Sequence, residues 1–109
     1  MRLELAQSAL SDLLAIKAWY LEQGVPQIGQ RFVSDIIARA QRLTEHPDSG
    51  RMVPEFNQAN IREIILPPFR LVYLRQADCI SLIRVWRSER QLQLPAQSPN
   101  SKLFGSEKD

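Results

Sequence analysis

The segment from Ile61 to Leu92 constrains the fold of this chain more than any other. It contains three short runs rich in β-branched and aromatic residues, a composition that is typical of strands. Pro67-Pro68 and Gln76-Ala77-Asp78 separate the runs, and both breaks have the length and composition of tight turns. The segment therefore predicts three consecutive antiparallel strands, at Ile61–Leu66, Phe69–Arg75 and Ile80–Arg87.

The hydrophobic pattern distinguishes the middle strand from the last one. Phe69, Leu71 and Tyr73 alternate along the middle strand and mark one of its sides as apolar. In the last strand Leu82 and Ile83 are neighbours, which breaks the period of two. Two alternatives explain this break: a central strand buried on both faces, or a strand with a bulge.

Two amphipathic helices precede the strands. The first shows apolar residues at helical spacing after Ser8, a suitable N-cap, and it ends at Gly24, which tolerates positive φ. Pro26 suits the first turn of the second helix, whose apolar face runs from Ile28 to Leu43. The turn-forming run His46-Pro47-Asp48-Ser49-Gly50 ends it. The short link between the helices predicts an antiparallel helical hairpin.

The order of these elements defines the expected fold. Leu3–Ala6 is compatible with an edge strand, so the order is strand–helix–helix–strand–strand–strand. We predict an α+β fold of two layers, in which the N-terminal helical hairpin packs on one face of a small antiparallel sheet. A chain of 109 residues supports one domain, which we place at residues 1–94. The polar residues 95–109 are expected to form a flexible tail.

Composition narrows the environment and the chemistry. The lone Cys79 excludes an internal disulfide and favours a reducing compartment. Acidic residues interrupt every apolar run, so we expect no signal peptide and no membrane span, and a cytoplasmic location. The single histidine, His46, offers no zinc cluster and a poor basis for a Ser-His-Asp arrangement. Because Gly24 and Gly29 do not follow a strand, they form no phosphate loop, and we expect no metal and no cofactor.

Six arginines lie in the strand segment, although the formal net charge of the chain is only +2. Each can be a solvated strand position whose aliphatic stem covers apolar surface, and Arg75 and Arg84 also fit charges that discourage sheet-to-sheet pairing. The alternative is that four of them converge on an anionic partner, either phosphates or an acidic protein groove. These four are Arg62, Arg70, Arg87 and Arg90. Trp86 fits equally a core position and a surface anchor.

Several motifs follow one another in a characteristic order. The helices contain Ala9-x-x-Asp12-Leu13-x-x-Ile16 with Tyr20, then Phe32 with Ile36-Ile37. The link His46-Pro47-x-x-Gly50-Arg51 comes next, followed by Ile61-Arg62-Glu63-Ile64, Phe69-Arg70-Leu71-Val72-Tyr73 and Val85-Trp86-Arg87-x-x-Arg90-x-Leu92. In order and spacing, roughly from Leu3 to Leu92, the chain resembles the RelE/ParE superfamily of toxins from bacterial toxin–antitoxin systems. The fold of that superfamily agrees with the two-layer fold predicted above.

The resemblance implies one of two activities. RelE-type members are ribosome-dependent mRNA endonucleases, which need cations around the phosphate and a general acid or base. For such a nuclease the implied residues here are Arg62, Arg70, Tyr73 and Arg87. Ser88 and Leu94 stand where a catalytic arginine and a tyrosine would align, and no Tyr or His follows Val85. The ParE-type branch inhibits DNA gyrase and does no chemistry of its own, and it is the branch we expect, without catalytic residues. A member without toxicity, or with another target, is the third alternative.

The resemblance also implies partners. A cognate antitoxin, ParD-like or similar, would wrap this chain and carry the sequence-specific DNA binding, which we do not expect of this chain alone. The expected antitoxin contacts are apolar helix residues beyond those that one sheet face covers, unless they complete the core: Leu14, Trp19, Leu21 and Val33. An exposed edge strand would offer a partner a place for strand addition. The expected contacts with gyrase are Arg70, Trp86, Arg87 and Arg90.

Overall fold

The structure of the chain is a computed structural model that describes residues 1–87. Its helices and strands follow the predicted order, with one short strand added. They are β1 (Arg2–Leu5), α1 (Gln7–Glu22), α2 (Pro26–Arg42), β2 (Arg51–Met52), β3 (Ile61–Leu66), β4 (Phe69–Arg75) and β5 (Cys79–Arg87). Arg90, Ser88, Leu94 and the predicted tail lie outside the described residues. Within the described part, neither helix is long and apolar enough to cross a membrane.

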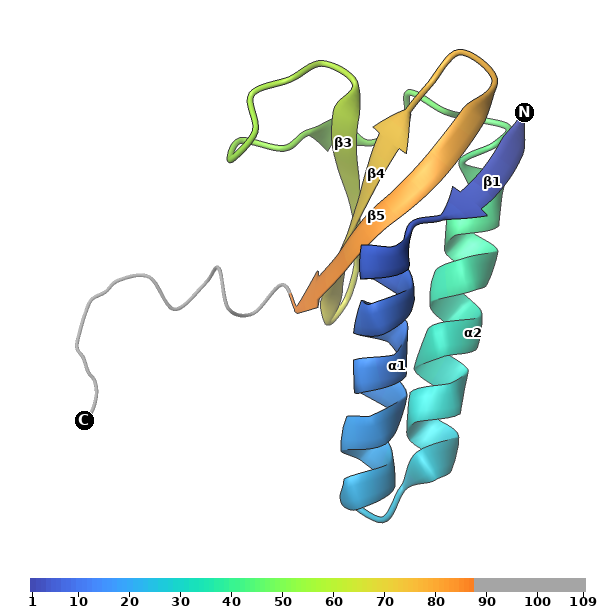
Figure 1. Ribbon diagram of the computed structural model, residues 1–109, viewed down its shortest axis with the longest axis vertical. Helices are drawn as coiled ribbons and strands as arrows, with labels where there is room; N and C mark the ends of the chain where they lie inside the picture. The colour runs from blue at the N-terminus through green and yellow to red at the C-terminus, as the bar shows by residue number, and fades with distance from the viewer. Residues whose placement is uncertain (88–109) are drawn as a thin grey trace, which may run out of the picture.

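The five strands form one sheet in the order β1-β5-β4-β3-β2 (Figure 1). Strands β3, β4 and β5 form the predicted antiparallel meander, and β2 extends it by pairing Arg51 with Glu63. The two-layer α+β prediction is confirmed, but β1 pairs with β5 in parallel, so the sheet is mixed at this edge. A parallel pair needs a long crossover, which the helices and the meander between β1 and β5 supply.

A bulge interrupts the pairing of β4 with β5. Tyr73 lies opposite Leu82, whereas Val72 lies opposite Arg84, so Ile83 is the extra residue. The bulged strand is therefore the correct one of the two alternatives for the broken period in β5. Its consequence is that side chains on both sides of Ile83 keep their apolar members, such as Leu82, in the core.

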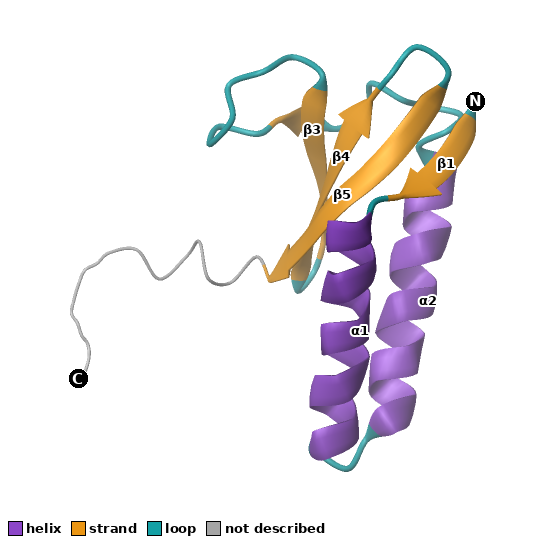
Figure 2. Cartoon of the chain, viewed as in Figure 1, coloured by secondary structure: helices purple, strands orange, loops and turns teal. Residues whose placement is uncertain are grey.

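The main core fills the space between the helical hairpin and one face of the sheet (Figure 2). Its helix residues are Ala9, Leu13, Ile36, Ala40 and Leu43, and its strand residues are Ile64, Phe69, Leu71, Tyr73, Ile80, Leu82 and Val85. The far ends of both helices extend beyond the sheet, so the turn between them lies away from the strands (Figure 1). This arrangement explains why large apolar residues near the end of α1 stay exposed.

The helix boundaries show which local signals held. Gly24 has φ +79°, and α2 begins at Pro26, as the sequence predicted. The N-cap of α1 is Ala6 rather than Ser8, which was predicted wrongly. Because α1 starts directly after β1, Ser8 falls inside the first turn, and its hydroxyl donates to the Ile83 carbonyl on β5. Gly29 has a packing reason: a Cβ there would lie 3.0 Å from Tyr20 Cβ.

Candidate functional site

The strand register assigns the predicted site residues to two different faces of the sheet. On the face toward the helices, Arg62 lies opposite Tyr73, and Arg87 lies opposite Phe69. The other face, here called the open face, carries the cross-strand row Ile65, Arg70 and Trp86. The open face also carries Arg51, Glu63, Val72 and Arg84. The four residues implied for a nuclease are therefore not brought together.

Arg70 is buried in a charge network on the open face. Only 3% of this residue is exposed. Its Nε donates to Glu63 Oε1 at 2.7 Å, and its Nη1 and Nη2 each donate to the Glu55 carboxylate at 3.1 Å. Arg51 Nε donates to the other Glu63 oxygen at 2.7 Å. Two carboxylates thus compensate two guanidinium groups, which is the condition for keeping such charges buried.

The sequence prediction missed both carboxylates of this network. Hydrogen bonding to Arg70 holds the pKa of Glu55 below its ordinary value, so this carboxylate stays charged at neutral pH. Glu63 is fully buried in the middle of β3. A carboxylate inside an otherwise apolar strand was the available signal for Glu63, whereas nothing in the loop sequence marks Glu55.

Trp86 lies at the surface, held by two arginines. The guanidinium carbon of Arg70 is 5.3 Å from the centre of the Trp86 ring, and that of Arg84 is 5.4 Å from it. Phe56, in the loop between β2 and β3, lies 6.3 Å from Trp86 between ring centres. Trp86 is partly exposed and lies outside the main core. Of its two predicted environments, the structure favours the surface anchor.

Asp12 connects α1 to the middle of the sheet. Its carboxylate accepts hydrogen bonds from Arg84 Nε at 2.9 Å and Arg84 Nη2 at 3.2 Å. It also accepts the Val85 backbone N–H at 2.8 Å, so it caps β5 where β1 has already ended. Asp12 belongs to the motif in the first helix, but its partners lie more than seventy residues away in sequence.

Tyr73 and Arg62 serve the connection between α2 and β2. Tyr73 is fully buried, and its hydroxyl donates to the Pro47 carbonyl at 2.8 Å and accepts the Gly50 N–H at 3.0 Å. Burial raises the pKa of Tyr73. Arg62 Nη1 donates to the Gly50 carbonyl at 2.8 Å. This phenol is therefore fixed in the core with both hydrogen-bonding roles in use.

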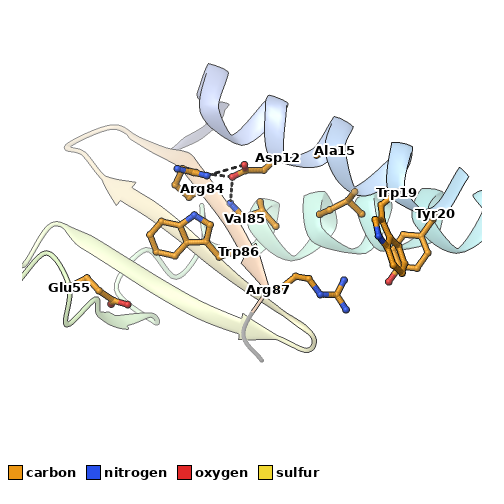
Figure 3. Close-up of a pocket in the computed structure, with 10 residues that line it drawn as sticks. Asp12, Ala15, Trp19, Tyr20, Glu55, Arg84, Val85, Trp86 and Arg87 are labelled. Atoms are coloured by element: carbon orange, nitrogen blue, oxygen red, sulfur yellow. Dashed lines mark hydrogen bonds and ion pairs between the residues drawn. The ribbon is translucent and has the colours of Figure 1, made fainter. Parts of the chain in front are cut away.

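A groove of about 700 Å³ separates α1 from the second half of β5. The α1 side is formed by Asp12, Ala15, Ile16, Trp19 and Tyr20, and the sheet side by Arg84, Val85, Trp86 and Arg87, with Glu55 from the loop (Figure 3). The groove has aromatic rings at both ends and two charges of each sign. Such a lining suits an extended or helical peptide segment better than a polyanion.

The four predicted antitoxin contacts have different environments. Trp19 is 51% exposed and lines the groove. Leu14 and Leu21 are 66% and 64% exposed, but they lie roughly 200° around the helix from Asp12 and Trp19 respectively, since each residue turns the helix by about 100°. Val33 is partly buried and packs against the core. Leu10, one turn before Leu14 and also exposed, is an apolar neighbour that the prediction missed.

The described residues contain no group of three His, Cys, Asp or Glu side chains placed to hold a metal ion. What they do contain is a peptide-sized groove beside a rigid aromatic residue, on a helical hairpin packed against a five-stranded sheet. These features define a small α+β domain built for protein contact.

Residues 3–92 match the family described as "ParE toxin of type II toxin-antitoxin system, parDE". This chain belongs to that family. It is 30% identical over 83 residues to Toxin RelE2 of Caulobacter vibrioides, covering 75% of this chain and 89% of that protein. A solved structure titled "Chromosomal ParDE TA system from P. aeruginosa" superposes with a TM-score of 0.65 at 26% identity. That match covers 80% of this chain and 95% of the other.

Proposed function

We propose that this chain is the toxin of a toxin–antitoxin pair, and that it acts in the cytoplasm by binding DNA gyrase rather than by cutting RNA. The observation that carries the proposal is the charge network of Arg70. Glu63 and Glu55 compensate the one arginine that matches the middle-strand cation of the nucleases. An arginine paired in this way has little electrostatic attraction left for a phosphate.

The positions of the remaining residues support the same proposal. Cleavage of RNA by its own 2′-hydroxyl needs a general acid or base within hydrogen-bond reach of the reacting atoms. Tyr73 is the phenol that the nuclease alternative requires, and it is buried with a raised pKa. It also points to the face opposite Arg70, beside Arg62. The described residues therefore provide neither the converging cations nor a reachable proton donor.

The antitoxin is proposed to occupy the groove between α1 and β5. A volume of about 700 Å³ and an exposed Trp19 give a peptide segment apolar surface to bury. The structural relative is titled as a toxin–antitoxin complex, which supports a partner of this kind. Leu14 and Leu21 would be reached by an antitoxin segment that continues around α1.

The first test uses the purified, antitoxin-free chain in two assays: gyrase supercoiling of plasmid DNA, and primer extension on mRNA in a translating extract. We expect supercoiling to be inhibited and the mRNA to stay intact. Tyr73→Phe should inhibit gyrase as well as the wild type does, provided that it is assayed at a temperature where it is folded. Codon-phased mRNA cuts with unaffected gyrase would contradict the proposal and restore the ribonuclease alternative.

The antitoxin site has its own test. Trp19→Ala should weaken binding of the cognate antitoxin, measured by isothermal titration calorimetry, by roughly tenfold or more, because exposed tryptophans often dominate interfaces. The matched control is Ile65→Ser on the open face, which does not line the groove. Equal affinity of Trp19→Ala and the wild type would place the antitoxin elsewhere.

A further inference from the structure

Three large apolar side chains cluster on the open face, where no helix covers the sheet. Ile65 is 45% exposed, Phe56 is 39% exposed, and Trp86 is partly exposed. We infer that these three residues, here called the aromatic patch, form the surface that contacts the protein target. The patch would receive an apolar side chain flanked by carboxylates. The inference rests on the proposed function, because it names the site that the inhibitory contact uses.

The strand register brings the patch together. Ile65 and Trp86 lie on either side of Arg70 in one cross-strand row, so they are separated by two strand spacings of roughly 4.8 Å each. Phe56 approaches the Trp86 ring from the loop between β2 and β3. Arg70 lies almost fully buried between Ile65 and Trp86. An apolar side chain laid across this row would therefore contact both of them over a guanidinium that is already paired.

The patch is held rigidly before any partner arrives. Arg70 and Arg84 both lie within 5.5 Å of the Trp86 ring centre, and carboxylates fix both arginines. The loop that carries Phe56 is fixed by the bidentate pair of Glu55 with Arg70 and by the fully buried Val53. Rigid aromatic residues lose little conformational entropy on binding, which is why they are frequent interface anchors.

The charges around the patch indicate the chemistry of the partner. Arg51 and Arg84 are partly exposed there, and so is Glu55, while Glu63 and Arg70 compensate each other below. The accessible rim is therefore mildly positive, which suits a few carboxylates of a protein surface. A nucleic acid would face Glu55 and two arginines that are already bound to Glu63 and Asp12, so it is the less suitable partner.

Ile65 is the best residue for a test, because Trp86 also lines the groove whereas Ile65 does not. Two variants, Ile65→Ser and Phe56→Ser, should weaken gyrase inhibition about tenfold or more and should also relieve growth inhibition in cells that express the chain. The matched control is Leu14→Ser, which removes an exposed apolar side chain of α1. It should inhibit gyrase and growth as the wild type does. Thermal unfolding confirms that all three variants fold.

The outcomes separate the two proposals. If the wild type inhibits gyrase and both patch variants inhibit it equally well, the inference is wrong and the proposed function stands. If the wild type leaves gyrase active but stops growth, the gyrase proposal fails. Growth inhibition retained by the patch variants would then overturn the inference, and relief of it would support the inference for another target. Binding of a single-stranded RNA that Ile65→Ser abolishes would also overturn it. A wild type that does not inhibit growth contradicts both proposals.

Discussion

The two faces of the sheet use the same three strands in opposite ways. Toward the helices, Leu71 and its neighbours form an apolar core, and Tyr73 is its one hydroxyl. On the open face, Glu63 and Arg70 are buried just as deeply, but their burial depends on paired charges rather than on helix packing. The difference shows that a strand arginine is no sign of an anion-binding surface until its neighbours across the sheet are known.

The comparison also separates two kinds of residue that sequence patterns treat alike. Arg70 and Arg84 are both arginines of the open face, and both lie against Trp86. Arg70 is bound by two glutamates from β3 and the loop, whereas Arg84 is bound by Asp12 from α1. One arginine therefore ties the loop to the sheet and the other ties the helix to it. The following substitutions test how much each connection contributes.

The largest effect is expected for the buried pair. Glu63→Ala leaves Arg70 buried without its closest carboxylate and should lower the free energy of unfolding by about 3–5 kcal/mol in urea denaturation. Leu71→Ala on the helix side should cost a comparable amount, about 2–5 kcal/mol. Arg51→Ala is the control, since this more exposed partner of Glu63 should contribute about 1 kcal/mol or less. If Glu63→Ala costs no more than Arg51→Ala, the open face does not depend on the buried pair.

The next effect concerns the one polar group of the helix-side core. Tyr73→Phe leaves the Pro47 carbonyl and the Gly50 N–H without their partner, which should cost about 1–3 kcal/mol. Because burial raises the pKa of Tyr73, the folded state keeps this proton at a pH where the unfolded state has lost it. Wild-type stability from this source is complete below pH 10, roughly the ordinary tyrosine pKa, and falls as the pH rises toward the raised value. Tyr73→Phe should show a shallower fall, and equal slopes would contradict this assignment.

The connection of α1 to β5 should be worth less. Asp12→Asn keeps an acceptor for the Val85 N–H but removes the charge that holds Arg84, and Arg84 is partly exposed. The expected loss is about 1 kcal/mol, the difference between charged and neutral hydrogen bonds. In a Trp19→Phe background Trp86 is the only tryptophan, so its fluorescence should also shift as Arg84 moves. An unchanged spectrum would show that Asp12 does not position Arg84 against Trp86.

The smallest effect is expected at the loop. Glu55 is about half exposed, so Glu55→Gln should cost less than about 1 kcal/mol at pH 7. The hydrogen bond from Arg70 lowers the pKa of Glu55, so its contribution is present above the ordinary glutamate pKa and is lost as the pH falls toward the lowered value. Unfolding of the wild type and the variant at pH 7 and pH 3 measures this. A gap that widens at acid pH would reverse the assigned sign.

Much of the fold follows from the sequence because local patterns determine its elements. The bounds of β3 and β4 match the predicted ones, and the helix break at Gly24 and Pro26 is where turn chemistry places it. The break of period in β5 announced a bulge or a doubly buried strand, and the structure has the bulge at Ile83. These features depend on residues close together in the chain, so propensity and periodicity are sufficient for them.

The site could be predicted only in part, because its partners are distant in sequence. The sequence marked Arg70 and Trp86 as residues of interest, but Arg70 binds Glu55, fifteen residues away, and Arg84 binds Asp12, seventy-two residues away. Which carboxylate meets which arginine depends on strand register, on the bulge and on the position of α1 against the sheet. The parallel pairing of β1 and the hydrogen bond of Ser8 to β5 depend on that same packing. The sequence by itself determined the elements and the apolar side of β4, and the tertiary structure decided which charges are compensated and which surfaces remain for a partner.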